Sequence, residues 1–325
     1  MRAAWYESRG PAAEVLRVGE IPDPHAGPGE VRIRIARSGI NPGDVKKRAP
    51  WLGYTVPAHP RIIPHSDGAG TVDEVGAGVQ LTVGARVWCF GAQSYRAFGT
   101  AAEYVVVPEA LAVALPERAS FAAGACLGIP GITAHRLVFH GDPVRGRRVL
   151  VQGGAGAVGA LAVRLAVAGG AEVIATVRDA AQVEAVRAAG ASHVLTTRGD
   201  ELVDEVLAAT GGRGVERIVE VAFAANVEVD TRLLAVGGTL ASYATDAEQP
   251  KIPFWPLLFK DASIYLCGSD EVPLTAKREA ATALNALLAQ GWDGPPAGEE
   301  LPLERIAEAH ETVDRGARAR VLLAL

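Results

Sequence analysis

Residues 149–166 read "VLVQGGAGAVGALAVRLA": a short β-branched stretch, a glycine cluster and an apolar segment whose only charge is Arg164. The pattern predicts a buried strand over 149–151, a helix over about 157–168 and a second strand over 173–177, the spacing of a nucleotide-binding βαβ unit. Gly154-x-Gly156-x-x-Gly159 by itself is also explained by a tight strand-to-helix turn. In this context we predict a phosphate site, because glycines admit a pyrophosphate to backbone N–H groups at a helix N-terminus.

The tip of the second strand, "ATVRD" over 175–179, bears on which dinucleotide binds. An NAD site places a carboxylate there for the ribose hydroxyls, whereas an NADP site supplies a cation and hydroxyls for the 2′-phosphate. Thr176 and Arg178 favour NADPH. Asp179 is explained as the N-cap of the helical pattern that follows, with Gln182 three residues later. Two alternatives stay open: Arg178 is a solvated surface charge, or Asp179 meets the ribose and NADH is preferred.

The chain changes character on either side of this unit. Before about residue 120, Pro and Gly are frequent and "EVRIRIARSG" over 30–39 predicts an antiparallel strand, with Val31, Ile33 and Ile35 inward. Beyond it, short buried-strand patterns alternate with helical segments, as in a parallel sheet covered on both faces. Residues 273–291 predict an amphipathic helix, and the C-terminal segment predicts a helix and a closing strand.

Composition excludes several classes of protein. The 325 residues are 49% hydrophobic and 21% charged with a net charge of −5, which favours two globular domains and disfavours a nucleic-acid partner. The start of the chain has no signal-peptide pattern and no apolar stretch is long enough to cross a membrane, so we expect a cytoplasmic protein. The cysteines, Cys89, Cys126 and Cys267, are dispersed and are interpreted as core residues.

Six stretches, taken in order along the chain, carry a family resemblance. They are "SGINPGDVKKR" from Ser38, "PHSDGAGTVDEVGAGV" from Pro64, "GARVW", "GTAAEYVVVP", "LGIPGITAHRLV" and the glycine turn. With them the whole chain resembles the medium-chain dehydrogenase/reductase superfamily, and within it the zinc-independent quinone oxidoreductase branch.

The resemblance implies an α/β protein of two domains. A GroES-like, partly closed β-barrel catalytic domain would take residues 1–122 and 271–325. A Rossmann domain with a doubly wound parallel sheet, binding NADP, would take residues 123–270. It also implies a homodimer joined through the Rossmann sheets, with residues 262–268 near the seam.

The resemblance also assigns residues to the site. Asn41 and Thr133 would lie near the nicotinamide and its ribose, and Asn41 would take part in catalysis. Tyr54 is the candidate donor to the substrate oxygen, and Trp51 is an alternative. Further cofactor contacts are expected at the turn, at the second strand and at the ends of two later strands: Gly153, Gly154, Gly156, Ala157, Val158, Thr176, Arg178, Val221, Ala222, Phe223, Tyr243 and Ala244.

Zinc ligands are missing at the expected positions. Relatives that use zinc carry a cysteine where this chain has Asn41 and a His-Glu pair where it has Ser66 and Asp67. His65 lies one position away from the ligand slot, and a lone histidine is more often hydrogen-bonded than coordinating. We expect no catalytic metal.

Loss of zinc restricts the substrate, because a simple alcohol needs a Lewis acid to stabilise its alkoxide. A quinone or an α,β-unsaturated carbonyl accepts hydride into a delocalised oxyanion and needs only hydrogen bonds and a proton. Three hypotheses remain: an NADPH-dependent quinone reductase, an NADPH-dependent reductase of enones or enoyl thioesters, and a non-catalytic dinucleotide-binding protein. Aromatic residues over 51–98, among them Trp88, Phe90, Tyr95 and Phe98, could line a pocket for a planar quinone or belong to the core.

Overall fold

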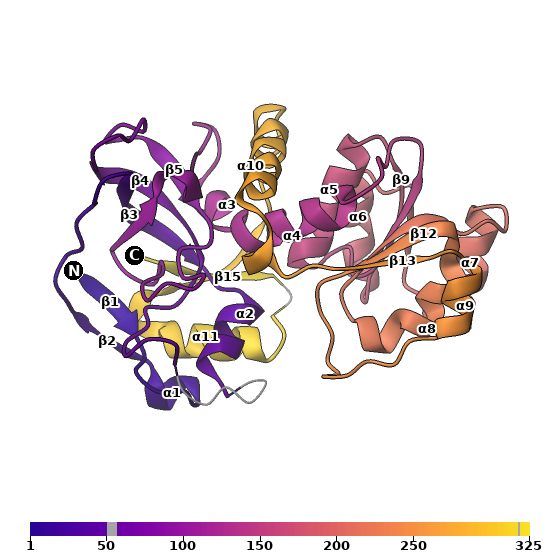
Figure 1. The fold of residues 1–325 in the computed structure, drawn as a ribbon, viewed down its shortest axis with the longest axis horizontal. Helices are drawn as coiled ribbons and strands as arrows, with labels where there is room; N and C mark the ends of the chain where they lie inside the picture. Colours follow the sequence, from indigo (N-terminus) through magenta and orange to yellow (C-terminus); the bar gives the residue numbers. More distant parts are fainter. Residues whose placement is uncertain (51–56, 318) are drawn as a thin grey trace. The chain divides into compact units, whose positions relative to one another are not determined.

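The computed structural model describes residues 1–50, 57–317 and 319–325. The chain divides into two compact units, of which the first comprises residues 1–129 and 281–325 and the second residues 130–280 (Figure 1). The unit boundaries, after residues 129 and 280, fall inside two helices, α4 (Gly128–Phe139) and α10 (Leu274–Ala289).

The first unit is built on a seven-stranded sheet in the order β14-β15-β3-β4-β5-β7, with β6 paired to β3. Its elements are β1 (Arg2–Trp5), α1 (Ala12–Val15), β2 (Arg17–Glu20), β3 (Glu30–Gly39), α2 (Pro42–Arg48), β4 (Asp67–Val75), β5 (Arg86–Cys89), β6 (Tyr104–Pro108), η1 (Glu109–Leu111), β7 (Ala112–Ala114), α3 (Phe121–Ala125), β14 (Ala297–Pro302), η4 (Leu303–Arg305), α11 (Ile306–Asp314) and β15 (Arg320–Ala324).

Strand β3 organises this sheet because it pairs with three others. Its first half pairs with β6, its last residues pair with the C-terminal strand β15, and β4 runs antiparallel along almost its whole length. Two register shifts between β3 and β4 bend the strand, as bulges do in curved sheets. Among the described residues the sheet does not close: β14, β7 and the branch strand β6 each pair with one neighbour only.

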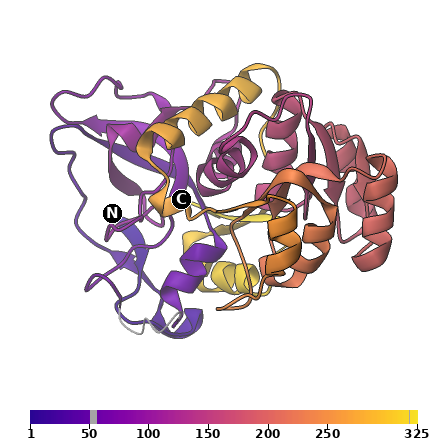
Figure 2. The same ribbon diagram turned by 45° about the vertical axis from the view of Figure 1, so that its right-hand side comes forward.

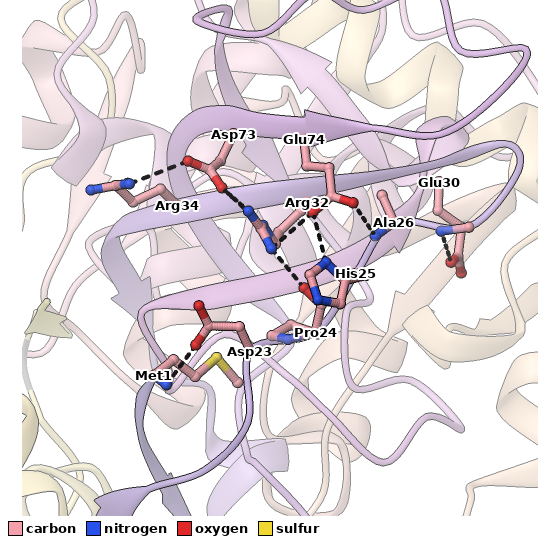
Figure 3. Close-up of polar contacts among 11 residues, drawn as sticks. Met1, Asp23, Pro24, His25, Ala26, Glu30, Arg32, Arg34, Asp73 and Glu74 are labelled. Carbon is pink, nitrogen blue, oxygen red and sulfur yellow. Dashed lines mark hydrogen bonds and ion pairs between the residues drawn. The ribbon is translucent and has the colours of Figure 1, made fainter.

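The outward face of β3 carries the charges that the alternation predicts. Arg32 pairs with Asp73 and with Glu74 of β4, the latter at 2.8 Å, and Arg34 reaches Asp73 at 3.2 Å (Figure 3). Both guanidinium groups also lie over the ring of Tyr104 on β6, at 5.0 and 5.2 Å from its centre, within the range of a cation–π interaction. The inward side chains are buried, and they are Val31, Ile33 and Ile35. The predicted alternation is confirmed.

The N-terminal and C-terminal segments share one apolar core, which is why the C-terminal tail belongs to the first unit. Ala4 and Tyr6 near the N-terminus pack in the same cluster as Ile306 of α11 and Leu323 of β15. The predicted closing strand thus lies against β3, with Leu323 opposite Ser38.

The second unit holds a six-stranded, fully parallel sheet in the order β10-β9-β8-β11-β12-β13 (Figure 2). Its elements are α4, β8 (Arg148–Val151), α5 (Ala157–Ala168), β9 (Glu172–Thr176), η2 (Ala180–Gln182), α6 (Val183–Ala188), β10 (His193–Leu195), α7 (Gly199–Ala209), β11 (Val215–Glu220), α8 (Phe223–Leu233), β12 (Leu234–Ser242), α9 (Phe254–Phe259), β13 (Ser263–Leu266), η3 (Ser269–Glu271) and the start of α10. This strand order is that of the Rossmann fold.

The expected parallel sheet is confirmed, and its strands are apolar because helices cover them. Leu150 of β8 and Ile218 of β11 share a core with Val206 of α7 and Val227 of α8. The three cysteines are free and buried, as their dispersal predicts. Within the described residues, no helix combines the length and apolar character that crossing a membrane requires.

Candidate cofactor and substrate site

The glycine turn joins β8 to α5 at the centre of the parallel sheet. β8 lies between β9 and β11. The chain continues from β8 to β9 and β10 on one side of it, and then crosses to β11, β12 and β13 on the other side. Crevices at such a switch point are where open α/β sheets bind ligands. The N–H of Gly154 donates to the carbonyl of Thr176 at 2.7 Å, which ties the turn to the end of β9. The first N–H groups of α5, including those of Ala157 and Val158, have no acceptor within the helix.

The glycines of this turn serve different purposes. A Cβ on Gly159 would stand 2.1 Å from the carbonyl oxygen of Gly153, so packing within the protein demands a glycine there. A Cβ on Gly156 would meet only that same oxygen, at 3.3 Å, and Gly156 has an ordinary φ of −74°. The fold thus tolerates a side chain at 156 far better than at 159, although the Gly153 carbonyl would have to shift by a few tenths of an ångström.

The tip of β9 presents one cation and one occupied carboxylate. Arg178 is exposed, and in the part of the chain that the structure describes it forms no ion pair or hydrogen bond. The Asp179 side chain accepts from the N–H of Ala181 at 3.0 Å, so its predicted N-cap role is confirmed, on the 3-10 turn η2 that leads into α6. The hydroxyl of Thr176 is buried and engaged within the protein: it accepts from Gly153 N–H and donates to Gln152.

The ends of β11 and β12 bring two further groups of expected cofactor residues side by side. Phe223 N–H donates to the carbonyl of Ala244 at 3.1 Å, next to Val221, Ala222 and Tyr243. Phe223 is buried, while the other residues are partly exposed. Burial, and then the nearby charge of Glu220, raises the pKa of Tyr243, so its phenol stays neutral.

In the first unit, Asn41 belongs to a buried group that we call the Asp67 network: Asn41, Asp67 and Arg320. Asn41 Nδ2 donates to Asp67 Oδ2 at 2.9 Å, Arg320 donates to the same oxygen at 2.6 Å, and Arg320 also donates to Asn41 Oδ1. The other oxygen of Asp67 accepts from the N–H of Ile129 at 2.9 Å. The amide of Asn41 is thereby held in one orientation, and among the described residues no acceptor takes its second N–H.

Burial affects both carboxyl groups around Asn41. It raises the pKa of Asp67, against the lowering effect of Arg320. It also raises the pKa of Asp44, whose carboxylate accepts from Asn41 N–H at 2.7 Å, to about 6. Asn41 therefore lies between two buried carboxyl groups, both of which have a raised pKa.

His65 belongs to a second buried chain of hydrogen bonds, which we call the imidazole chain: Arg48, His310, His65, Ser38 and Thr100. Thr100 Oγ1 must donate to the carbonyl of Asp67, 2.6 Å away, because that oxygen can only accept. Ser38 must then donate to Thr100 at 2.7 Å, which leaves Ser38 to accept from His65 Nδ1–H at 2.8 Å.

The remaining bonds follow the same direction. His65 Nε2 becomes the acceptor for His310 Nε2–H at 2.9 Å, and His310 Nδ1 accepts from Arg48 Nε–H at 3.4 Å. Burial lowers the pKa of both imidazoles, that of His310 to about 3, so both are neutral. His65 has a φ of 76°, unusual for a residue with a side chain, and this chain of bonds holds it there.

Other expected site residues have different outcomes. Thr133 lies buried on α4. Trp51 and Tyr54 lie outside the described residues. Trp88 and Phe90 belong to the core, and the indole N–H of Trp88 donates to Asn285 at 3.1 Å, so packing explains both. Tyr95 and Phe98 are exposed.

Comparison with known proteins assigns the family. Residues 27–117 match the alcohol dehydrogenase GroES-like domain, and residues 157–285 match the domain described as zinc-binding dehydrogenase. The chain is 31% identical to quinone oxidoreductase of Rattus norvegicus over 319 residues, covering 95% of this chain and 92% of that one. The human quinone oxidoreductase is 30% identical over 325 residues, covering 97% and 94%. The chain belongs to the medium-chain dehydrogenase/reductase superfamily, in its quinone oxidoreductase branch.

Solved structures of this superfamily share the whole fold. An NAD-dependent alcohol dehydrogenase superimposes with a TM-score of 0.88 at 28% identity, covering 100% of both chains. A mycobacterial protein in complex with NADPH superimposes with a TM-score of 0.85 at 26% identity, also covering 100% of both chains. A dinucleotide-binding oxidoreductase of the medium-chain type is therefore the activity class of this chain.

The Asp67 network does not fit the zinc ion that some members of this superfamily hold. Zinc sites in proteins use thiolate, imidazole and carboxylate ligands. Here the carboxylate of Asp67 is already paired with the guanidinium of Arg320, and the amide oxygen of Asn41 accepts from the same cation. A divalent cation at this place would stand against a buried positive charge.

Several residues of these networks were not predicted from the sequence. Arg320 stands in an apolar closing strand and His310 is buried on α11, and a polar group buried in an apolar pattern is a signal that a partner exists. The identities of those partners depend on contacts between distant segments, since Arg320 and Asn41 are 279 positions apart.

Proposed function

We propose that this chain is an NADPH-dependent oxidoreductase that transfers a hydride to a quinone without a catalytic metal. The observation that carries the proposal is the Asp67 network, in which a guanidinium pairs with the carboxylate at the position of a zinc ligand. Similarity to mammalian quinone oxidoreductases along nearly the whole chain supports the substrate class.

The chemistry asked of the protein is modest. When bound, NADPH supplies the hydride, and the quinone accepts it as a delocalised oxyanion. The chain then has to hold the two reactants together and to offer hydrogen-bond donors to the developing charge. Asn41 is suited to this role because its amide is fixed by Arg320 and Asp67 and keeps one N–H. Tyr54 remains our candidate for a second donor.

Preference for NADPH over NADH rests on the tip of β9. Arg178 is exposed and forms no ion pair or hydrogen bond within the described residues, and the carboxylate of the adjacent Asp179 already accepts from a backbone N–H. A 2′-phosphate would gain a charge-assisted hydrogen bond there, which a 2′-hydroxyl would not. The NADPH complex of the mycobacterial neighbour agrees with this choice.

Steady-state oxidation of NADPH and NADH with a panel of quinones, enones and enoyl thioesters tests the proposal. We expect the highest kcat/KM with NADPH and a quinone. Faster turnover of enones or enoyl thioesters would assign the second activity, which uses the same electrophile chemistry. Tight cofactor binding with no turnover of any compound would indicate a non-catalytic binding protein.

We further propose that two copies associate through their Rossmann sheets. β13 is the last strand of the sheet order, and its Ile264 and Leu266 are exposed while Tyr265 between them stacks on His140 at 3.8 Å. Exposed apolar side chains on an edge strand support strand pairing with a second copy. Sedimentation analysis should show a dimer, and Leu266→Arg should yield monomers because it brings two like charges to the seam.

A further inference from the structure

Gly153 of the glycine turn is held by a side chain from the neighbouring strand. Its φ of 69° lies in the left-handed region, and its carbonyl accepts from Gly156 N–H at 2.9 Å. Its own N–H donates to Thr176 Oγ1 at 3.0 Å. The hydroxyl of Thr176 in turn donates to Gln152 Oε1 at 2.8 Å, so its single hydrogen is used inside the protein.

The chain of bonds continues into a pair of buried carboxyl groups. Gln152 Nε2 donates to Asp230 Oδ1 at 2.9 Å. Glu220 lies beside Asp230, and its oxygens accept from Asn226 Nδ2 at 3.1 Å each and from the N–H of Ala222. Asp230 and Glu220 are both 0% exposed, and within the described residues neither forms an ion pair with a cation.

One oxygen, Asp230 Oδ2, decides the protonation of this pair. It is buried, and among the described residues no donor lies within hydrogen-bond distance of it, while the Glu220 side chain interacts directly with that of Asp230. Two bare carboxylates in contact would repel each other in a medium of low polarity. Reversing the amide of Gln152 does not help, because a proton on Oδ1 would still leave Oδ2 bare beside Glu220.

We propose that Asp230 carries a proton, which it donates from Oδ2 to Glu220, and that Asp230, Gln152 and Thr176 form a positioning chain that holds Gly153 in the phosphate turn. Burial, followed by the charge of Glu220, raises the pKa of Asp230 and agrees with this state. The inference rests on the proposed cofactor function. It assigns Thr176 to the shape of the turn, and leaves recognition of a 2′-phosphate to Arg178.

A pair of near-isosteric variants tests the proton. In Asp230→Asn the amide oxygen accepts from Gln152 and the NH₂ group donates to Glu220, so the bonds of a protonated Asp230 are reproduced. In Glu220→Gln an NH₂ group must face the donors of Asn226 or Ala222. We expect Asp230→Asn to restore the melting temperature and NADPH affinity that Asp230→Ala loses, and Glu220→Gln to lower both. Equal damage from Asp230→Asn and Asp230→Ala would overturn the proposal.

Infrared spectroscopy of the cofactor-free protein at pH 7 gives an independent readout. The wild type should show the carbonyl stretch of a buried protonated carboxyl, and the difference spectrum against Asp230→Asn should contain that band. A difference spectrum with carboxylate bands alone would overturn the proton assignment. This result does not depend on whether the protein binds NADPH, so it separates failure of the proton assignment from failure of the proposed function.

Thr176 is tested by comparing two cofactors. Thr176→Val removes the hydroxyl, and we expect NADPH and NADH to bind more weakly by the same factor, about tenfold, because both share the pyrophosphate. Thr176→Ser keeps the hydroxyl and should restore both affinities. Weakening of NADPH alone would show that the hydroxyl contacts the 2′-phosphate, and would overturn the positioning role.

Discussion

Asp67 and Glu220 are fully buried carboxyl groups, one in each unit, and the chain compensates them in different ways. Asp67 is paired with the cation Arg320 and accepts from Asn41 and the N–H of Ile129. Glu220 has amide donors and the neighbouring acid Asp230, and no cation pairs with it among the described residues. A buried charge can thus be balanced by an opposite charge or by a shared proton, and the two solutions respond differently to mutation.

The largest expected effect comes from removing the cation. Arg320→Met leaves Asp67 buried without its partner, and we expect the free energy of unfolding to fall by about 3–5 kcal/mol. Urea unfolding at pH 7 measures it. Arg320→Lys should lose less, because the charge stays while the two-pronged geometry is lost. Combining Arg320→Met with Asp67→Asn should recover part of the loss. A loss below about 1 kcal/mol in Arg320→Met would show that the pair contributes little.

The second prediction concerns the imidazole chain and pH. The folded pKa of His310, about 3, lies below the ordinary value of 6.5, so its contribution to stability is present above pH 6.5 and is lost as pH falls from 6.5 toward 3. In His310→Gln, the side chain can donate to His65 and accept from Arg48 without titrating. Between pH 6 and 4 the free energy of unfolding of His310→Gln should fall less steeply than that of the wild type. We expect the two slopes to differ by about 1.4 kcal/mol per pH unit.

Unfolding curves at several pH values measure this difference. The exposed His193 offers a matched control, because His193→Gln removes an imidazole that does not belong to the imidazole chain. Stability profiles of His310→Gln and wild type that run parallel would contradict the neutral, directed arrangement of the imidazole chain.

The third prediction concerns Arg178, an exposed arginine of the Rossmann unit. Arg178→Ala should weaken NADPH binding by about 1–3 kcal/mol and leave NADH nearly unchanged, because only the 2′-phosphate meets the guanidinium. Fluorescence titration at fixed ionic strength measures both affinities. Arg187→Ala, on the exposed face of α6, is the control. Unchanged NADPH binding would make Arg178 a solvated charge, and tighter binding of NADH than NADPH in the wild type would assign the ribose to Asp179.

The fourth prediction tests the difference between Gly156 and Gly159, since only Gly159 is demanded by close packing. Gly156→Val places its Cβ against the Gly153 carbonyl, which must shift by a few tenths of an ångström, so we expect only a small fall in the melting temperature. Both cofactors should bind at least about tenfold more weakly, because the pyrophosphate loses its approach to the backbone. Gly156→Ala should lie between Gly156→Val and wild type. Unchanged affinity for both cofactors in a folded Gly156→Val would mean that the turn is structural only.

The strands, the helices and the glycine turn could be predicted from local patterns in the sequence, whereas the assignment of the C-terminal tail to the first domain came from the family resemblance. The helix predicted over 157–168 is α5 with the same bounds, and the alternation over 30–39 is β3. Asp179 as an N-cap also followed from residues within one helical turn. Such features need only neighbours along the chain.

The networks could not be predicted in the same way, because their partners come from distant segments. His65 could be interpreted as hydrogen-bonded, but its partner His310 lies 245 positions away. The aromatic stretch gave a mixed result for a similar reason: Trp88 and Phe90 are core residues, which depends on packing that the sequence pattern does not show.

The central claim is that this chain reduces a quinone with NADPH and without a metal. Its most direct test is the rate of NADPH oxidation by a quinone after exhaustive dialysis against a chelator, with the zinc content measured on the same sample. We predict unchanged kcat at a zinc content far below one ion per chain. Loss of turnover on chelation, with recovery on adding zinc, would contradict the claim.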